Sequence, residues 1–413
     1  MKSLITKSII SLLGILVLWV VGGNLLTSAL LHKKNQQWQD LKQPLLRTGK
    51  NQSAIELEVL IKKLGREYVQ VLLITSTIDP APIPITLAKY LKEKAQDIAI
   101  IRQYVLENQS PSWPFDPELM VSFENLTEHV SVNLTMTQIQ QLLMVEALSQ
   151  HTQGNDELAF QTLVAGRKIN SRIWDQPVFL SQLHGLVSSQ YHLYILRRLN
   201  TVPENWEEQI FGYSLNQLFF DTASAEALAN TQKIDPFSGT SSYYSDSWIF
   251  IQPFYIVISP YIRLLHYDFL QAQEFVFSPH ENQNLCSFNP EETEEEISRN
   301  LSWWNYDRYS PPYSSLSSIR RRYLQLQLNI ELTQKIIEIK EQANQLGSWP
   351  SLDRMIPSSL CRDTAWLYTV TPDEVMSIVL SSKKEWLSTM AEIPIHGTTH
   401  FHDLVPMYTE KLP

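Results

Sequence analysis

The stretch TQIQQLLMVEALSQHTQGNDELAFQTLVAGRKINSRIW, residues 137–174, carries the clearest folding signal of the chain. Two apolar, helix-forming runs flank Gly154, and glycine is the residue that most commonly follows the end of a helix. Asn155 suits the N-cap of the second run, and Asp156 and Glu157 fall in its first turn, where the helix dipole favours anions. Small residues that permit close helix packing recur at Ala147, Ala159 and Gly166. The stretch therefore predicts an antiparallel helical hairpin.

Helical periodicity continues on both sides of this hairpin. We expect one or two polar helices in 33–65, then helices at about 87–105, 177–199, 204–231 and 316–346. The last of these has one stripe of Leu316, Ile319, Tyr323, Leu326 and Ile330, and a second stripe of Leu324, Leu328, Leu332, Ile336 and Ile339. An apolar arc this wide is typical of a central helix that packs on more than one side.

Strands are expected only near the C-terminus. Apolar and polar residues roughly alternate over 366–370 and again near 378–380, which favours short strands. The predicted fold class is mainly α: a single N-terminal transmembrane helix, then a multi-helix domain, with a few short strands near the C-terminus.

Composition limits the class of protein. The chain has 413 residues with 11 Trp and 17 Tyr, so a folded core is expected. Only 12 residues are Gly, which disfavours folds built on phosphate-binding glycine loops. The formal net charge of −10 opposes binding to phosphate backbones, so we expect no nucleic-acid partner.

The N-terminal segment predicts a membrane anchor. Residues 8–32 contain no Lys, Arg, Asp or Glu, and about twenty apolar residues are enough to span a bilayer. A cleaved signal peptide is the alternative, with Gly23 or Ala29 near a cleavage point, but the apolar stretch is long for one. We therefore favour an uncleaved anchor at 8–31.

The flanking charges leave the orientation open. Five basic residues between 33 and 50 outnumber Lys2 and Lys7, which by the positive-inside rule would place the C-terminal side in the cytoplasm. Long domains translocate largely regardless of flanking charge, and a short stub before a large translocated domain is common in signal anchors. We expect the bulk of the chain to be extracytoplasmic, either periplasmic or at the cell surface. Glycosylation sequons at Asn51, Asn108, Asn125, Asn133 and Asn300 do not decide the question.

The predicted organisation follows from these segments. It comprises a stub at 1–7, the anchor at 8–31, a helical domain at 32–232, a continuous helix-dominated portion at 233–390 and a tail at 391–413. Within the fourth part, 248–259 is apolar enough to suggest a second span, but Gln252, Pro253, Pro260 and Arg263 favour a buried or interface-touching helix.

Several polar or aromatic groups have an ordinary structural interpretation. His184 and His192 are expected to be plain helix histidines, and the acidic run 289–299 a solvated helix start. Arg320, Arg321 and Arg322 are expected to be solvated charges. The aromatic run 302–315 either fills a gap between helices or binds a partner.

Two residue sets suggest covalent or metal chemistry. Cys286 and Cys361 are the two cysteines, without zinc-ligand spacing, and they form a disulfide or stay free thiols depending on the compartment. The sequence HGTTHFHD contains candidate ligands for a divalent metal such as zinc, namely His396, His400, His402 and Asp403. A polar tail is the favoured alternative for this last stretch. No cofactor-binding motif is found, and no catalytic residue is assigned.

Two stretches resemble known families. The hairpin resembles one tetratricopeptide unit, without recurrence at a fixed period. In 324–382, Gly347, Trp349, Pro350, Leu352 and Pro357, followed by Leu367, Tyr368 and Val370, resemble bacterial membrane-anchored envelope proteins of no assigned activity and the C-terminal part of type II secretion pseudopilins. The N-terminus lacks the pseudopilin processing site. The resemblance implies a helix followed by short strands.

The leading functional prediction is a non-enzymatic one. We expect a membrane-anchored extracytoplasmic interaction or scaffold protein, held by its N-terminal helix and binding a protein partner. A metal-dependent envelope enzyme that uses residues 396–403 is the first alternative. An accessory component of a secretion or pilus-like system is the second, and it rests on the resemblance alone.

Overall fold

A computed structural model describes most of the chain. The described residues are 2–46, 50–65, 83–113, 126–174, 179–211, 218, 222, 257–265, 267–268, 270–272, 295–296, 298–305, 314–350, 354–382 and 407–411. They are mainly helical, with a small antiparallel sheet near the C-terminus, as the sequence predicts.

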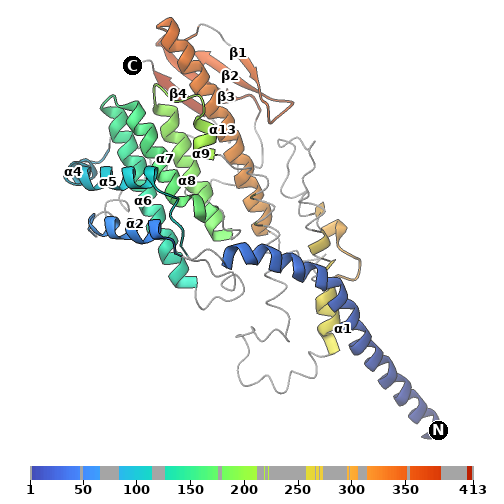
Figure 1. Ribbon diagram of the computed structural model, residues 1–413. Helices are drawn as coiled ribbons and strands as arrows, with labels where there is room; N and C mark the ends of the chain where they lie inside the picture. Colours follow the sequence, from blue (N-terminus) through green and yellow to red (C-terminus); the bar gives the residue numbers. More distant parts are fainter. Residues whose placement is uncertain are drawn as a thin grey trace.

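The first helix is long and extends away from the helical body. Helix α1 runs over Lys2–Leu46, 45 residues, or about 68 Å at the rise of an α-helix. It extends from the helical body with the N-terminus at its far end (Figure 1). Its segment Ile10–Lys33 is long and apolar enough to cross a membrane, and only 6% of the most apolar window is buried. The polar helix expected after the anchor begins as a continuation of α1.

A layer of short helices follows. It consists of α2 (Gln52–Lys62), α4 (Ile85–Glu93) and α5 (Ala95–Glu107). The sequence predicted one helix over most of α4 and α5, but the backbone turns at Lys94, with φ −103° and ψ 10°. This break allows the buried faces of both helices to reach one core, which contains Leu87 and Leu91 from α4 and Ile98 and Ile101 from α5.

The predicted hairpin forms the next layer. Helix α6 (Leu126–Thr152) and helix α7 (Asp156–Trp174) are antiparallel neighbours joined at Gly154, whose φ of +79° is a conformation that glycine adopts without strain. Gly166 of α7 lies close to α6, since a Cβ placed on it would be 3.5 Å from Gln140. Ala147 and Ala159 are fully buried, as expected for closely packed helices.

Helix α13 (Ser314–Leu346) occupies the centre of the remaining part. It packs against α8 (Phe179–Arg198), while α9 (Trp206–Phe211) adds to the same helical core. One predicted stripe contributes Tyr323, Leu326 and Ile330 to this core. The second stripe lies against the sheet and consists of Leu324, Leu328, Leu332, Ile336 and Ile339. The prediction of a central helix with two apolar stripes is confirmed for these residues.

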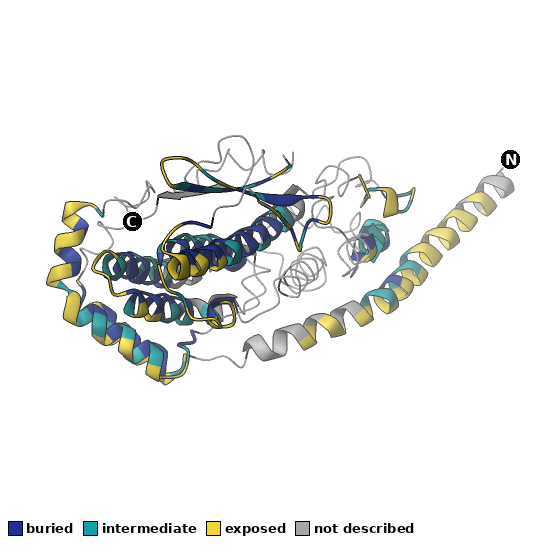
Figure 2. Cartoon of the chain, turned by 90° about the horizontal axis from the view of Figure 1, so that it is seen from above, coloured by how far each residue is buried: buried dark blue, intermediate teal, exposed yellow. Residues whose placement is uncertain are grey.

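The sheet is a meander of four antiparallel strands. They are β1 (Arg354–Pro357), β2 (Ala365–Val370), β3 (Val375–Leu380) and β4 (Met407–Lys411), in the order β1-β2-β3-β4. Trp366 pairs with Leu380 and Tyr368 with Ile378, and these four side chains are buried against α13. The sheet thus forms one layer over α13 (Figure 2). The strand β4 lies within the stretch that the sequence suggested was a tail.

Buried apolar side chains join these layers in sequence. The α6–α7 hairpin contributes to one cluster with α2, α4 and α5 and to another with α8, α9 and α13. Helix α13 contributes to that second cluster and to the cluster under the sheet. The helical portion and the later portion therefore share a core within the described part of the chain.

Candidate functional site

The predicted metal ligands lie outside the described residues. This applies to His396, His400, His402 and Asp403, so the metal site stays a prediction. Within the described part of the chain, no three His, Cys, Asp or Glu residues are grouped in a way that could hold a metal ion.

One of the two cysteines is described. Cys361 follows β1, is fully buried in the cluster between α13 and the sheet, and is disulfide-bonded. Cys286 lies outside the described residues, so the pairing of Cys286 with Cys361 stays a prediction.

His192 is enclosed by backbone and amide groups. Its Nε2 lies 3.1 Å from the Leu163 carbonyl, and its Nδ1 lies 2.9 Å from the Ser188 carbonyl and 3.4 Å from Gln140 Nε2. Burial, followed by the nearby positive charge of Arg167, lowers the pKa of His192 to about 4. The low pKa keeps the ring neutral, so a single ring N–H donates to a carbonyl, either Nδ1–H to Ser188 or Nε2–H to Leu163. This agrees with the expected ordinary role; the side chain of His184 lies outside the described residues.

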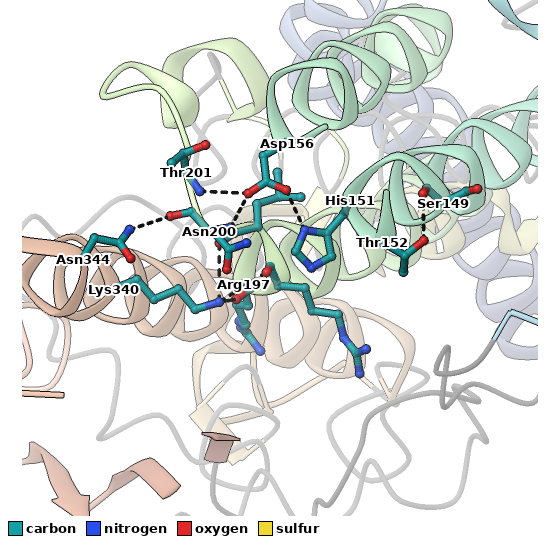
Figure 3. A network of polar contacts seen from close by, with 11 residues as sticks. Ser149, His151, Thr152, Asp156, Arg197, Asn200, Thr201, Lys340 and Asn344 are labelled. Atoms are coloured by element: carbon teal, nitrogen blue, oxygen red, sulfur yellow. Dashed lines mark hydrogen bonds and ion pairs between the residues drawn. The ribbon is translucent and has the colours of Figure 1, made fainter. Parts of the chain in front are cut away.

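A polar junction lies where α6, α7, α8 and α13 end or begin (Figure 3). Asp156 accepts hydrogen bonds from the backbone N–H of Asn200 at 2.6 Å and of Thr201 at 3.2 Å, and it contacts His151 Nδ1 at 2.6 Å. On the other side of the same loop, Lys340 Nζ lies 2.6 Å from the Arg197 carbonyl. Lys340 therefore satisfies a carbonyl that the end of α8 leaves without an intrahelical partner, and Asp156 holds two N–H groups of the loop that follows.

The junction continues as a ladder of polar contacts between α8 and α13. Arg197 donates to Thr333 Oγ1 at 2.8 Å and to Asn329 Oδ1 at 2.8 Å. Tyr323 Oη lies 2.5 Å from Gln182 Oε1. All these side chains are buried, so their hydrogen bonds fix the register of the two helices.

A buried carboxylate holds the loop that follows β1. Glu331 of α13 accepts a hydrogen bond from Ser358 Oγ at 2.7 Å, and it also accepts from the N–H and the hydroxyl of Ser359. This side chain is 2% exposed. Like the carboxylate of Asp156, that of Glu331 accepts hydrogen bonds from other groups of this chain.

The arginines near the start of α13 are less exposed to solvent than the sequence predicts. They were predicted to be solvated, but Arg322 is buried, and burial together with the charge of Arg321 lowers the pKa of its guanidinium. Burial also lowers the pKa of Arg320, which is partly offset by Glu296. The sequence pattern missed this because a run of arginines by itself predicts exposure to solvent.

The most unusual contact joins α1 to a helical stretch that begins at the end of the apolar segment 248–259. We call the helical residues 257–265 the docked segment. Trp19 Nε1 donates to the Val257 carbonyl at 2.8 Å, and a Cβ placed on Gly23 would lie 2.8 Å from Pro260 Cβ. Two polar side chains of the docked segment also face α1. Ser259 Oγ and the Arg263 guanidinium donate to Asn24 Oδ1 at 3.2 and 3.3 Å. The Arg263 guanidinium also contacts Ser28 Oγ at 3.2 Å.

An aromatic corner adjoins the docked segment. Tyr261 Oη donates to the Trp304 carbonyl at 3.0 Å, and the two rings lie 6.2 Å apart. Asp268 accepts from the Ser302 N–H at 2.7 Å and from Asn305 at 3.0 Å. Trp303, between these fixed residues, is 80% exposed. Residues 306–313 of the predicted aromatic loop lie outside the described residues.

Comparison of the chain with protein-family models, with curated proteins and with solved structures finds no match in any of the three. The junction, the ladder and the Glu331 site bind groups of the fold itself, whereas α1 and the aromatic corner leave large apolar side chains exposed. Sequence reasoning found α1 but not its contact with the docked segment, because their residues are more than two hundred positions apart.

Proposed function

We propose that this chain is a membrane-anchored extracytoplasmic interaction protein. Helix α1 holds it in the bilayer, and the helical body presents its surface to a protein partner. The observation that carries the proposal is the apolar stretch Ile10–Lys33, whose side chains have little protein around them. A stretch of this length matches the hydrocarbon thickness of a bilayer, and exposing it to water would be unfavourable.

The extracytoplasmic placement is supported by Cys361. This residue is disulfide-bonded, and disulfides persist mainly in oxidising compartments outside the cytosol. The interaction role is supported by the use of the buried polar residues. Asp156, Lys340 and Glu331 all bind groups of this chain, which makes a rigid body for presenting a surface.

The experiment is protease protection on intact cells and on spheroplasts, with a tag after Pro413. External protease is expected to remove the tag, and alkylation with a membrane-impermeant maleimide is expected to require prior reduction. If the tag is protected until the membrane is lysed, the orientation is wrong. If the protein is released by carbonate extraction, the anchor itself is wrong.

The partner is sought by photo-crosslinking in cells. Ile55 and Val59 are exposed and one helical turn apart on α2, and they are suitable positions for a photoreactive residue. Val17 of α1 is the matched control, because a lipid-facing residue should give no protein adduct. Discrete protein adducts from the body are expected. A body that gives none from any exposed position contradicts the interaction role.

A further inference from the structure

We propose that the docked segment, residues 257–265, lies inside the outer leaflet of the bilayer against α1, so that lipid covers its outward face. The partner of this surface is the lipid of the membrane, from the acyl chains to the headgroup level. The inference rests on the proposed anchoring by α1 and deepens it, because it assigns a second membrane-embedded element to the chain.

The position of Trp19 in the apolar stretch indicates how deep the docked segment lies. Trp19 lies 9 positions after Ile10 and 14 before Lys33 in the apolar stretch, which corresponds to about 14 Å and 21 Å along the helix. The indole N–H of Trp19 donates to the Val257 carbonyl. A segment bonded at this level lies well inside the hydrocarbon, whose thickness is about 30 Å.

The composition of the docked segment fits this depth. Its sequence is VISPYIRLL, in which only Ser259, Tyr261 and Arg263 carry polar groups. Ser259 and Arg263 direct these groups to Asn24 and Ser28 of α1. A polar group in a bilayer has to be satisfied by protein, and here α1 supplies the partners.

The packing with α1 is as close as small residues allow. Gly23 lies against Pro260, and a Cβ placed on Gly23 would be only 2.8 Å from Pro260 Cβ. Thr27, one turn later, is 1% exposed although its neighbours on α1 are exposed. Helices in membranes associate through such small-residue contacts and through polar side chains between them.

The aromatic corner marks the outer border of the hydrocarbon. Arg263 contacts Ser28, which lies 5 positions before Lys33, or about 8 Å from the end of the apolar stretch. Tyr261 holds Trp304, next to which Trp303 is 80% exposed. Tryptophan and tyrosine concentrate at the headgroup level, and long cationic side chains extend toward it. Trp303 therefore lies at the level of the headgroups.

The test uses the full chain in phosphatidylcholine and phosphatidylglycerol vesicles, with nitroxide labels on single introduced cysteines. The label sites are Ile258→Cys and Ile262→Cys in the docked segment, Val17→Cys on α1 and Val59→Cys on α2. Parent protein without an introduced cysteine controls for labelling of native thiols. Accessibility to molecular oxygen is compared with accessibility to a water-soluble nickel chelate.

Labels at positions 258 and 262 are expected to favour oxygen, as position 17 does, with 258 deeper than 262. Position 59 is expected to favour the nickel chelate. If 258 and 262 behave like 59 while 17 stays in lipid, the inference fails and the anchor stands. If 17 also favours nickel, the proposed anchoring fails with it. If 258 and 262 are shielded from both reagents, protein covers the surface and the inference is wrong.

A pair of glycine variants tests the contact with α1. Gly23→Leu is expected to displace Pro260 and change the depth of the label at 262 without changing that at 17. Gly22→Leu is the matched control, because among the described residues nothing outside the backbone of α1 itself lies within 4 Å of a Cβ at that position. Equal effects of the two variants, or no effect of Gly23→Leu, would show that the segment does not dock on α1 in the membrane.

Discussion

At the scale of the residue, His192 makes the stability of the helical body sensitive to pH. Its folded-state pKa of about 4 lies below the ordinary value of about 6.5, so between these values the unfolded chain binds the proton more tightly. The contribution of His192 to the free energy of unfolding is therefore fully present above the ordinary pKa and is lost as the pH falls toward 4. Between about pH 7.5 and about pH 5 the loss from this residue is about 2 kcal/mol.

The measurement is urea unfolding of the full chain in detergent at both pH values, for the parent and for His192→Gln. The groups that face the ring are Gln140 from α6, Leu163 and Arg167 from α7, and the Ser188 carbonyl of α8 itself. Carboxylates elsewhere also titrate, and burial raises the pKa of Glu146. The quantity compared is therefore the change in unfolding free energy between the two pH values, in the parent and in the variant. A pH effect of equal size in the variant would contradict the assignment.

Asp156 gives a second prediction at this scale. It was expected to act on the dipole of α7, but it also holds the N–H groups of Asn200 and Thr201. Asp156→Ala removes two hydrogen bonds from these part-buried donors to a carboxylate and is expected to cost about 1.5–3 kcal/mol of unfolding free energy. Glu157→Ala is the control, because its side chain is exposed in the same turn, and it should change stability by less than about 0.5 kcal/mol.

At the scale of the element, Lys340 of α13 caps the C-terminus of α8. Its Nζ lies 2.6 Å from the Arg197 carbonyl and 3.4 Å from the carbonyls of Arg198 and Leu199. Lys340→Met keeps most of the apolar stem and removes the donor, so it should destabilise the chain by about 1–3 kcal/mol. Lys335→Met, which removes an ion pair with the exposed Glu338, should have little effect. Thermal unfolding of both variants decides the point, and equal shifts in Tm would count against the capping role.

The elements also show what the sequence can predict. The described residues of both stripes of α13 were found because each stripe repeats at helical spacing and meets its own buried cluster, whereas the side chains of Leu316 and Ile319 lie outside the described residues. The α6–α7 hairpin was found because the turn at Gly154 is local. The use of Asp156 by the α8 loop was missed because it depends on a segment distant in sequence, and the burial of Arg322 because an arginine run predicts exposure. The break at Lys94 was missed because the apolar spacing continues through it. Distance in sequence also hides the contact of α1 with the docked segment.

At the scale of the whole molecule, the shared helices predict a single cooperative body. The α6–α7 hairpin and α13 each contribute side chains to two buried clusters, so neither the short helices nor the sheet has a core of its own. Leu163→Ala in the helical core and Ile378→Ala under the sheet both leave a cavity at a fully buried site. Each should cost about 2–5 kcal/mol.

Hydrogen exchange of the full chain in detergent tests whether that cost is shared. If the layers unfold together, each variant lowers the protection of the slowest amides in α7 and in β2 by a similar factor, because those amides exchange through global unfolding. Loss of protection in β2 alone with Ile378→Ala would instead mean that the sheet opens independently of the helices. The amides of α13 also separate shared unfolding from independent opening, because α13 lies between the helices and the sheet. If the layers unfold together, both variants should lower the protection of the α13 amides. If the sheet opens alone, the two variants should affect the α13 amides unequally.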